Sequence, residues 1–247
     1  MTLRVIAIDG PAASGKSSTA ALVARRLAWA HLDSGALYRA ITLAALDNLG
    51  ETGKGKLETW SAQQIVALAE DLPVRLVFVD DVFRPEVAGV DVAQAIRSER
   101  VTQRVSEIAA IPEVRHWVNV QQREAVQGHG RGVVVDGRDI GTVVFPDAPL
   151  KVFLTASPEE RARRRLAERG RGGGSGGSGG SGGGGANDAP ELRREAEVLA
   201  ARDRADSTRA VAPLKAAADA VVLDTTRLSL EQQVQAVVAL ARERLPG

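Results

Sequence analysis

The sequence predicts an α/β fold in which helices cover a mostly parallel sheet. Short apolar runs alternate with longer segments of helical periodicity, the pattern expected when crossover helices join parallel strands. The runs are rich in Val, Ile and Leu and lack polar alternation, so we expect both faces of the sheet to be buried. With 247 residues, 44% of them hydrophobic, the chain is long enough to bury a sizeable core.

The predicted elements follow one another along the chain. We expect strands at residues 3–9, in a short run ending near residue 32, and at 132–136, 150–154 and 220–223. We expect helices at residues 16–28, 36–49, inside 92–110, and at 113–127, 158–168 and 230–244.

Two segments depart from this alternation. Residues 74–92 contain β-branched runs on either side of Asp80-Asp81, which predicts a small antiparallel sheet inserted into the α/β body. We therefore divide the chain into a core, residues 1–60 and 111–247, and an inserted subdomain, residues 61–110. Residues 172–185 are only Gly and Ser, which predicts a flexible coil, either a natural low-complexity segment or an engineered linker.

Charge and composition exclude several classes of function. The 32 Lys and Arg residues nearly balance the 31 Asp and Glu residues, so no overall basic bias indicates binding to nucleic acid or to a membrane surface. The absence of cysteine excludes disulfides, thiolate metal sites and thiol catalysis. The N-terminus lacks the apolar length of a signal peptide, and no run approaches a membrane span. We expect a cytoplasmic protein.

The strongest motif is the stretch GPAASGKSS, which lies between a predicted strand and a predicted helix. It matches G-x-x-x-x-G-K-[ST], a loop whose backbone N–H groups and following helix N-terminus surround phosphates. Lys16 is expected to bridge the β- and γ-phosphates of ATP, and the Ser17 hydroxyl to bind Mg²⁺. An ordinary Gly/Ser-rich turn is the alternative. The residues predicted to bind ATP are Gly10, Pro11, Ala12, Ala13, Ser14, Gly15, Lys16, Ser17 and Ser18.

Other features narrow the class of phosphate-loop protein. No N-K-x-D stretch is present, which argues against a GTPase. The apolar run at 133–135 ends in Asp136-Gly-Arg-Asp139, a mixture of acids and a guanidinium group that favours a second anionic substrate. His31, His116 and His129 share no metal-ligand spacing, and we assign them no chemistry.

Three further clusters are rich in groups that bind phosphates or polar rings: LDSGALYR at 32–39, VDGRDIGTVVFPDAP at 135–149 and RDRADSTRAVAPL at 202–214. Together with the phosphate loop they resemble the cytidylate kinase family of bacterial nucleoside monophosphate kinases, over nearly the whole chain except the Gly/Ser run. The resemblance implies a nucleoside monophosphate kinase fold, in which residues 61–110 form the monophosphate-binding insertion and residues 161–205 a mobile lid. It implies ATP and Mg²⁺ on the donor side, CMP and dCMP as acceptors, and a monomer.

The resemblance also implies roles in binding the acceptor nucleotide. Ser34, Arg39 and Arg138 would hold its phosphate, because guanidinium groups match phosphate oxygens in pairs. Cytosine has an amino donor at N4 and acceptors at N3 and O2, so it requires an acid and a donor in the site. The resemblance assigns base recognition to a group of four residues: Ser106, Arg115, Asp139 and, nearby, Arg209.

The remaining roles fall on the sugar and the transferred phosphoryl group. Asp206 would accept hydrogen bonds from the sugar hydroxyls, with Arg202 beside it, although an i,i+4 ion pair between these two is the alternative. Arg161, Arg164 and Arg165 resemble the arginines of the lid. The predicted catalytic residues are Lys16, Arg138, Arg164, Arg165 and Arg202.

Simpler interpretations stay open from the residues alone. Arg39 could lie on a solvated helix face, and Asp139 could cap a helix or pair with Arg138. The alternative functions are a kinase for another monophosphate, chiefly UMP, or for a small alcohol such as shikimate. A non-catalytic module gated by ATP is a further alternative.

Overall fold

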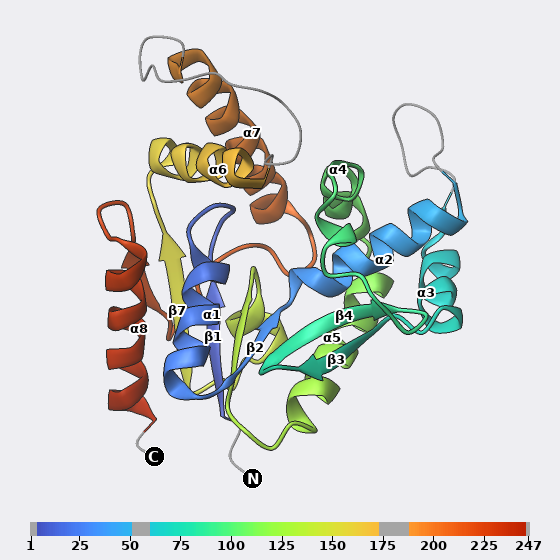
Figure 1. The fold of residues 1–247 in the computed structure, drawn as a ribbon, viewed down its shortest axis with the longest axis horizontal. Coiled ribbons are helices and arrows are strands. Elements are labelled where there is room, and N and C mark those ends of the chain that lie inside the picture. The colour runs from blue at the N-terminus through green and yellow to red at the C-terminus, as the bar shows by residue number, and fades with distance from the viewer. Residues whose placement is uncertain (1–3, 51–59, 173–187, 246–247) are drawn as a thin grey trace.

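The computed structural model describes residues 4–50, 60–172 and 188–245, and in it helices flank both faces of a central sheet (Figure 1). The eight-stranded sheet has the order β3-β4-β2-β6-β1-β7-β8, with β5 paired to β4. Every pair from β4 through β8 is parallel, while β3 and β5 run antiparallel to β4. The predicted α/β class with a mostly parallel sheet is confirmed.

The observed bounds agree closely with those of the predicted elements, whereas α3 and α7 lie outside the predicted ranges. The strands are β1 Val5–Asp9, β2 Ala30–Asp33, β3 Arg75–Val79, β4 Val82–Val87, β5 Val90–Asp91, β6 Val133–Gly137, β7 Leu150–Thr155 and β8 Val221–Asp224. The α-helices are α1 Lys16–Leu27, α2 Gly35–Asn48, α3 Ala62–Asp71, α4 Glu99–Ile108, α5 Pro112–Gln127, α6 Pro158–Gly172, α7 Asp188–Thr208 and α8 Leu230–Arg244. A 3₁₀ turn at Ala95–Arg97 and a π-helical turn at Ile140–Val144 complete the chain. Apart from Gly172, the Gly/Ser run lies outside the described residues.

The two faces of the sheet bury different helices. On one face, Ile6, Ile8 and the alternate residues of β6 and β7 pack against the apolar sides of α1 and α8. On the other face, Val133 and Val135 pack with side chains from α5 and from the π-helical turn. Burial on both faces explains why these strands lack polar alternation. In the ranges that the structure covers, no helix combines the length and the apolar character that crossing a bilayer requires.

The inserted segment contains the predicted antiparallel hairpin but not a separate sheet. Its turn is at Asp80 and Asp81, which both have positive φ, as a tight two-residue hairpin requires. β4 pairs in parallel with β2 through His31 and Val82, so the hairpin extends the central sheet. The reason is that Phe83 is buried in the core of that sheet, which anchors β4 there. The division into a core and an inserted subdomain stays a prediction.

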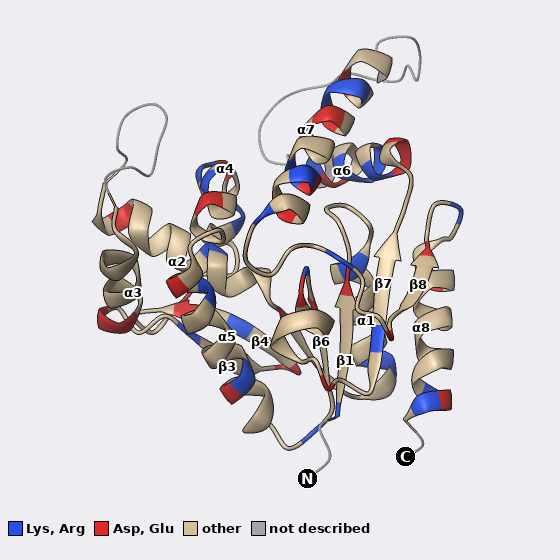
Figure 2. Cartoon of the chain, turned by 180° about the vertical axis from the view of Figure 1, so that it is seen from behind, with Lys and Arg blue, Asp and Glu red and all other residues tan. Residues whose placement is uncertain are grey.

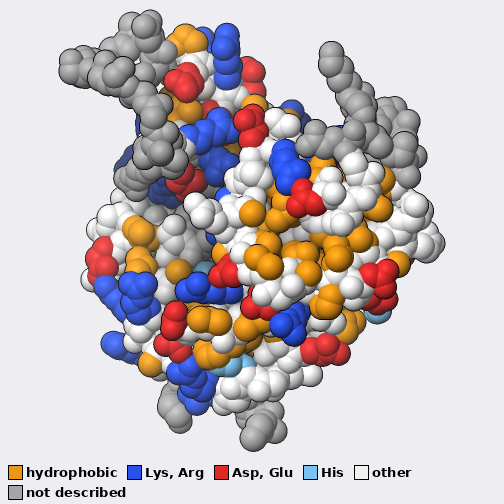
Figure 3. Space-filling model, turned by 45° about the vertical axis from the view of Figure 1, so that its right-hand side comes forward, with side chains coloured by type: hydrophobic (Ala, Val, Ile, Leu, Met, Phe, Trp, Pro, Cys, Tyr) orange, Lys and Arg blue, Asp and Glu red, His pale blue; other side chains and the backbone are white. Residues whose placement is uncertain are grey.

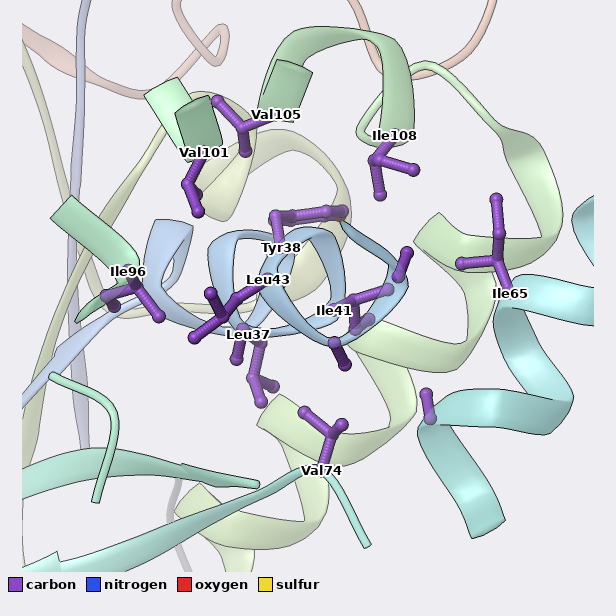
Figure 4. Close-up of a cluster of buried hydrophobic side chains, with 14 of the residues drawn as sticks. Leu37, Tyr38, Ile41, Leu43, Ile65, Val74, Ile96, Val101, Val105 and Ile108 are labelled. Atoms are coloured by element: carbon purple, nitrogen blue, oxygen red, sulfur yellow. The ribbon is translucent and has the colours of Figure 1, made fainter. Parts of the chain in front are cut away.

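A second hydrophobic cluster surrounds α2 (Figure 4). Ten of the fourteen residues of α2 are buried, and Leu37 and Ile41 are among the most fully buried side chains. Side chains from α3, α4 and α5 complete the cluster, including Ile65, Val101 and Val114. Because α2 is packed on several sides, its few polar residues have fixed positions, which matters for Arg39 below.

Gly132, directly before β6, tests the packing of Trp29 against the edge of the sheet core. A Cβ atom added to Gly132 would lie 2.2 Å from the Trp29 ring, which must then move. We expect Gly132→Ala to lower the free energy of unfolding by about 1–3 kcal/mol, as measured by denaturant unfolding. Gly170→Ala is the control, because nothing lies within 4 Å of its added Cβ and alanine favours a helix. Equal stability of the two variants would contradict the packing described here.

Candidate active site

A pocket of about 610 Å³ lies at the carboxyl ends of the central parallel strands, where open α/β sheets bind their ligands. Figure 2 shows acidic residues at the upper ends of these strands, below α6 and α7. The pocket is lined by part of the phosphate loop and by every residue predicted to bind CMP: Ser34, Arg39, Ser106, Arg115, Arg138, Asp139, Asp206 and Arg209. Segments far apart in the sequence therefore meet at this pocket.

The phosphate loop joins β1 to α1. Gly15 has a φ of 89°, which glycine adopts without strain, and a Cβ at Gly10 would lie 2.2 Å from the Leu154 carbonyl oxygen. The loop residues that line the pocket are Ala12, Ala13, Gly15, Lys16, Ser17 and Ser18. Of the other three residues predicted to bind ATP, Gly10 and Pro11 are buried, and the Ser14 carbonyl accepts hydrogen bonds from Arg164 and Thr225 behind the loop.

Asp136 lies at the end of β6 opposite the loop. It accepts a hydrogen bond from the Ser17 hydroxyl at 2.5 Å, and its other oxygen lies 2.8 Å from His31 Nε2. Burial opposes ionisation of this carboxyl group, but the bonds from His31 and Ser17 and the charge of Lys16 hold its pKa below the usual 3.8. Asp136 is therefore an oriented carboxylate.

The oxygen atoms of Ser17 and Asp136 fit Mg²⁺. This ion prefers oxygen ligands and usually binds one or two protein groups together with substrate phosphates and water. In phosphate-loop enzymes a loop Ser or Thr and an Asp at the end of a strand hold it. Ser17 was the one residue that the sequence analysis assigned to Mg²⁺. Asp136 could have been added from the sequence, since it follows an apolar strand, whereas His31 is found only once β2 and β6 are aligned.

Positive charge converges between the phosphate loop and the turn after β6. Burial, together with Arg138 and Arg202, lowers the pKa of Lys16 from 10.5 to about 7. Burial and then Arg138, Arg39 and Arg165 lower the pKa of Arg202 to about 10, and its buried Nε has no hydrogen-bond partner in the described part of the chain. These five cations repel one another across a single space, as expected of a site for a multiply charged anion.

The lining of the whole pocket has an excess of positive charge. Nine Lys and Arg side chains line it against five Asp and Glu, although the chain carries a net charge of only +1. Figure 3 shows Lys and Arg side chains gathered around the hollow in the upper part of the molecule. The local clustering of charge, not its total, therefore marks this protein as a binder of anions.

Arg39 does not lie on a solvated helix face. It is half-buried, lines the pocket, and donates to the Ile96 carbonyl at 3.2 Å and the Thr102 hydroxyl at 3.0 Å. Both acceptors are neutral, so these hydrogen bonds orient the guanidinium group, whose pKa is lowered by burial and raised by the charge of Asp33. Ser34 lies beside it in the same pocket, just before α2.

Asp139 lies between two arginines at the far end of the pocket. It accepts from buried Arg115 at 2.5 Å and lies 3.5 Å from Arg209. Arg138 instead pairs with Asp206, Nε to Oδ2 at 3.0 Å. The structure therefore contains an Arg138–Asp206 ion pair in place of the two alternatives, Asp139–Arg138 and Asp206–Arg202. An acid and a fixed guanidinium group are thus presented together, which suits an edge with both donor and acceptor atoms.

The three arginines of α6 that the resemblance assigns to a lid have distinct environments. Arg161 pairs with Asp203 of α7 and donates to the Ala12 carbonyl, which docks the two helices onto the phosphate loop. Arg164 donates to the Ser14 carbonyl and to Thr225, behind the loop. Arg165 lines the pocket. Of the two predicted catalytic arginines of α6, Arg165 therefore lies in the pocket and Arg164 supports the loop.

Known proteins identify the family of this chain. A model of the cytidylate kinase family matches residues 6–243. The chain belongs to the cytidylate kinase family. Curated cytidylate kinases are 44% identical in Limosilactobacillus fermentum and 45% in Desulfitobacterium hafniense, in each case over 97% of this chain. These alignments cover 96% and 93% of the two relatives. The chain is a nucleoside monophosphate kinase, and the resemblance drawn from its motifs is confirmed.

The neighbouring arginines of α6 provide a test. Arg165→Ala removes a cation from the cluster, and we expect kcat to fall roughly a hundredfold because comparable lost contacts to developing charge have that effect. Arg163→Ala is the matched control, since Arg163 is 64% exposed and pairs with Glu160. Steady-state kinetics of both variants are compared with the parent. Similar kcat values for the two variants would show that Arg165 does not act in the pocket.

Proposed function

We propose that this pocket transfers the γ-phosphoryl group of ATP directly to the phosphate of CMP or dCMP, giving ADP and CDP or dCDP for pyrimidine nucleotide metabolism. The observation that carries the proposal is the convergence of Lys16, Arg39, Arg138, Arg165 and Arg202 on one space. That space lies between a phosphate loop and an acid–guanidinium pair. It can accommodate a donor and an acceptor phosphate together.

The transfer needs positioning more than proton chemistry. The bond between the γ-phosphorus and the β,γ-bridging oxygen breaks, and a new bond forms to an oxygen of the acceptor phosphate. That oxygen is already anionic, so no base is required. The main task of the protein is to hold two repelling anions in line, and fixed cations do this without reorganising during the reaction.

Each half of the pocket has its own part in this arrangement. Lys16 and the loop N–H groups hold the donor phosphates, and Arg39, Arg138 and Ser34 hold the acceptor phosphate. Arg165 and Arg202 face the charge that develops between them. Mg²⁺, held by Ser17 and Asp136, would neutralise charge on the β- and γ-phosphates.

Base choice depends on Asp139. A carboxylate fixed by Arg115 and Arg209 can accept from the N4 amino group of cytosine, while Arg115 donates to the ring. Uracil has a carbonyl in place of that amino group, so acceptor would face acceptor. Leaving buried polar groups unpaired is the strongest means of discrimination that a site has. This argument favours CMP over the alternative acceptor UMP.

The remaining assignments complete the proposal. Asp206 accepts from the sugar hydroxyls while Arg138 holds its other side. The enzyme works in the cytoplasm as a monomer and binds neither nucleic acid nor membrane. A small alcohol acceptor or a module without turnover would not require the Asp139–Arg115 pair, so neither alternative is favoured.

A substrate panel tests the proposal. ADP release is measured in a coupled assay with CMP, dCMP, UMP, AMP and shikimate, with and without Mg²⁺. We expect magnesium-dependent turnover chiefly on CMP and dCMP, and its loss in Lys16→Ala, which removes the donor-side cation. Faster turnover on UMP or shikimate than on CMP would overturn the assigned acceptor.

Asp139→Asn tests base recognition. The amide replaces one acceptor oxygen by a donor, so we expect kcat/KM for CMP to fall and the UMP to CMP ratio of kcat/KM to rise, each by roughly ten- to a hundredfold. Asp47→Asn is the control, since Asp47 is exposed and pairs with Arg100 on the outside of α2 and α4. Melting temperatures separate misfolding from altered selectivity. An unchanged ratio in a folded Asp139→Asn variant would refute this role.

A further inference from the structure

Asp9, the last residue of β1, makes two hydrogen bonds to a distant segment. Its Oδ1 accepts from the backbone N–H of Ile140 at 2.8 Å, and its Oδ2 accepts from the N–H of Gly141 at 2.8 Å. Those two groups begin the π-helical turn Ile140–Val144, directly after Arg138 and Asp139. The carboxylate thus clamps the backbone that carries two residues of the acceptor site.

This clamp replaces a cap that the sequence offers locally. The first N–H groups of a helical turn have no partners within it, and an Asp at the preceding position normally caps them. Asp139 occupies that position, yet its side chain makes no capping bond and turns to Arg115 and Arg209 instead. Asp9 supplies the missing acceptors from another strand, so Asp139 remains available to a ligand.

The position of Asp9 has an electrostatic consequence. The side chain is buried, and burial raises its pKa from 3.8 to about 6, although the bonds from Gly141 and Ile140 oppose the rise. It is ionised at neutral pH, when both oxygens can accept. β1 does not need this carboxylate for its place in the sheet, because β6 and β7 pair with its backbone on both sides.

We propose that Asp9 is a positioning residue for the acceptor nucleotide, which sets the directions of Arg138 and Asp139 through the backbone of the turn. Asp9 immediately precedes Gly10, the first residue of the phosphate loop. The same residue therefore holds the turn that follows Asp139 and is adjacent to the loop that binds the donor phosphates. This role rests on the function proposed above.

Asp9→Asn tests the proposal with little change of shape. The amide oxygen can still accept from one N–H, but the amide nitrogen then faces the other N–H, donor against donor. We expect kcat/KM for CMP to fall at least tenfold, mainly through KM for CMP, and the UMP to CMP ratio to rise at least fivefold. KM for ATP should stay within about threefold, since the phosphate loop keeps its backbone bonds. Asp47→Asn again serves as the control.

Two further measurements make the result specific. In the Asp139→Asn background, adding Asp9→Asn should leave the UMP to CMP ratio unchanged, because Asp9 acts on that ratio through Asp139. Hydrogen exchange at the Ile140 and Gly141 amides should become faster in Asp9→Asn, a readout that needs no substrate. Faster exchange with unchanged kinetics would overturn the positioning role, as would equal rises in KM for ATP and CMP. If the parent enzyme itself does not use CMP, the proposed function fails, whereas the exchange result still reports on the clamp.

Discussion

The mutual repulsion of cations in one pocket is the constraint on which the rest of the site depends. Burial, and then the charges of Arg138 and Arg202, lower the pKa of Lys16, and burial and then Arg138, Arg39 and Arg165 lower the pKa of Arg202. Such a cluster destabilises the empty protein and is relieved when phosphates enter. The repulsion lowers the stability of the empty protein, and a bound phosphate removes this cost, so relief of the repulsion contributes to the free energy of binding. Such local destabilisation is a recurrent property of functional sites.

The fold holds these repelling groups in place by packing, by neutral hydrogen bonds at Arg39 and by an ion pair to Asp206 at Arg138. Arg39 is fixed by the burial of α2 and by a carbonyl and a hydroxyl group, none of which cancels its charge. Helices α6 and α7 are held by Arg161 and Asp203, which contact the carbonyl and the N–H of Ala12 in the phosphate loop. Two different arginines of α6 therefore have these two tasks: Arg161 attaches the helix to the phosphate loop, and Arg165 places a positive charge in the pocket.

The sequence was most informative where function depends on local chemistry. The phosphate loop and the strand ends could be predicted because spacing and apolar runs determine them. The junction of the hairpin with β2, the pairing of His31 with Asp136 and the clamp by Asp9 could not, because each depends on the register between strands distant in sequence. The choice among Arg161, Arg164 and Arg165 likewise required the packing of α6 against α7.

Asp139 illustrates why local rules fail at this site. Its position before a helical turn favours capping, and that interpretation ignores what another strand can contribute. Once Asp9 satisfies the turn, the carboxylate of Asp139 is free for buried Arg115, for half-buried Arg209 and for a ligand. Asp9 reaches the turn because β1 and β6 align Asp9 with Gly137. The position of Asp139, to which we assign base recognition, thus depends on the register of two central strands, which the hydrophobic core on both faces of the sheet holds in place.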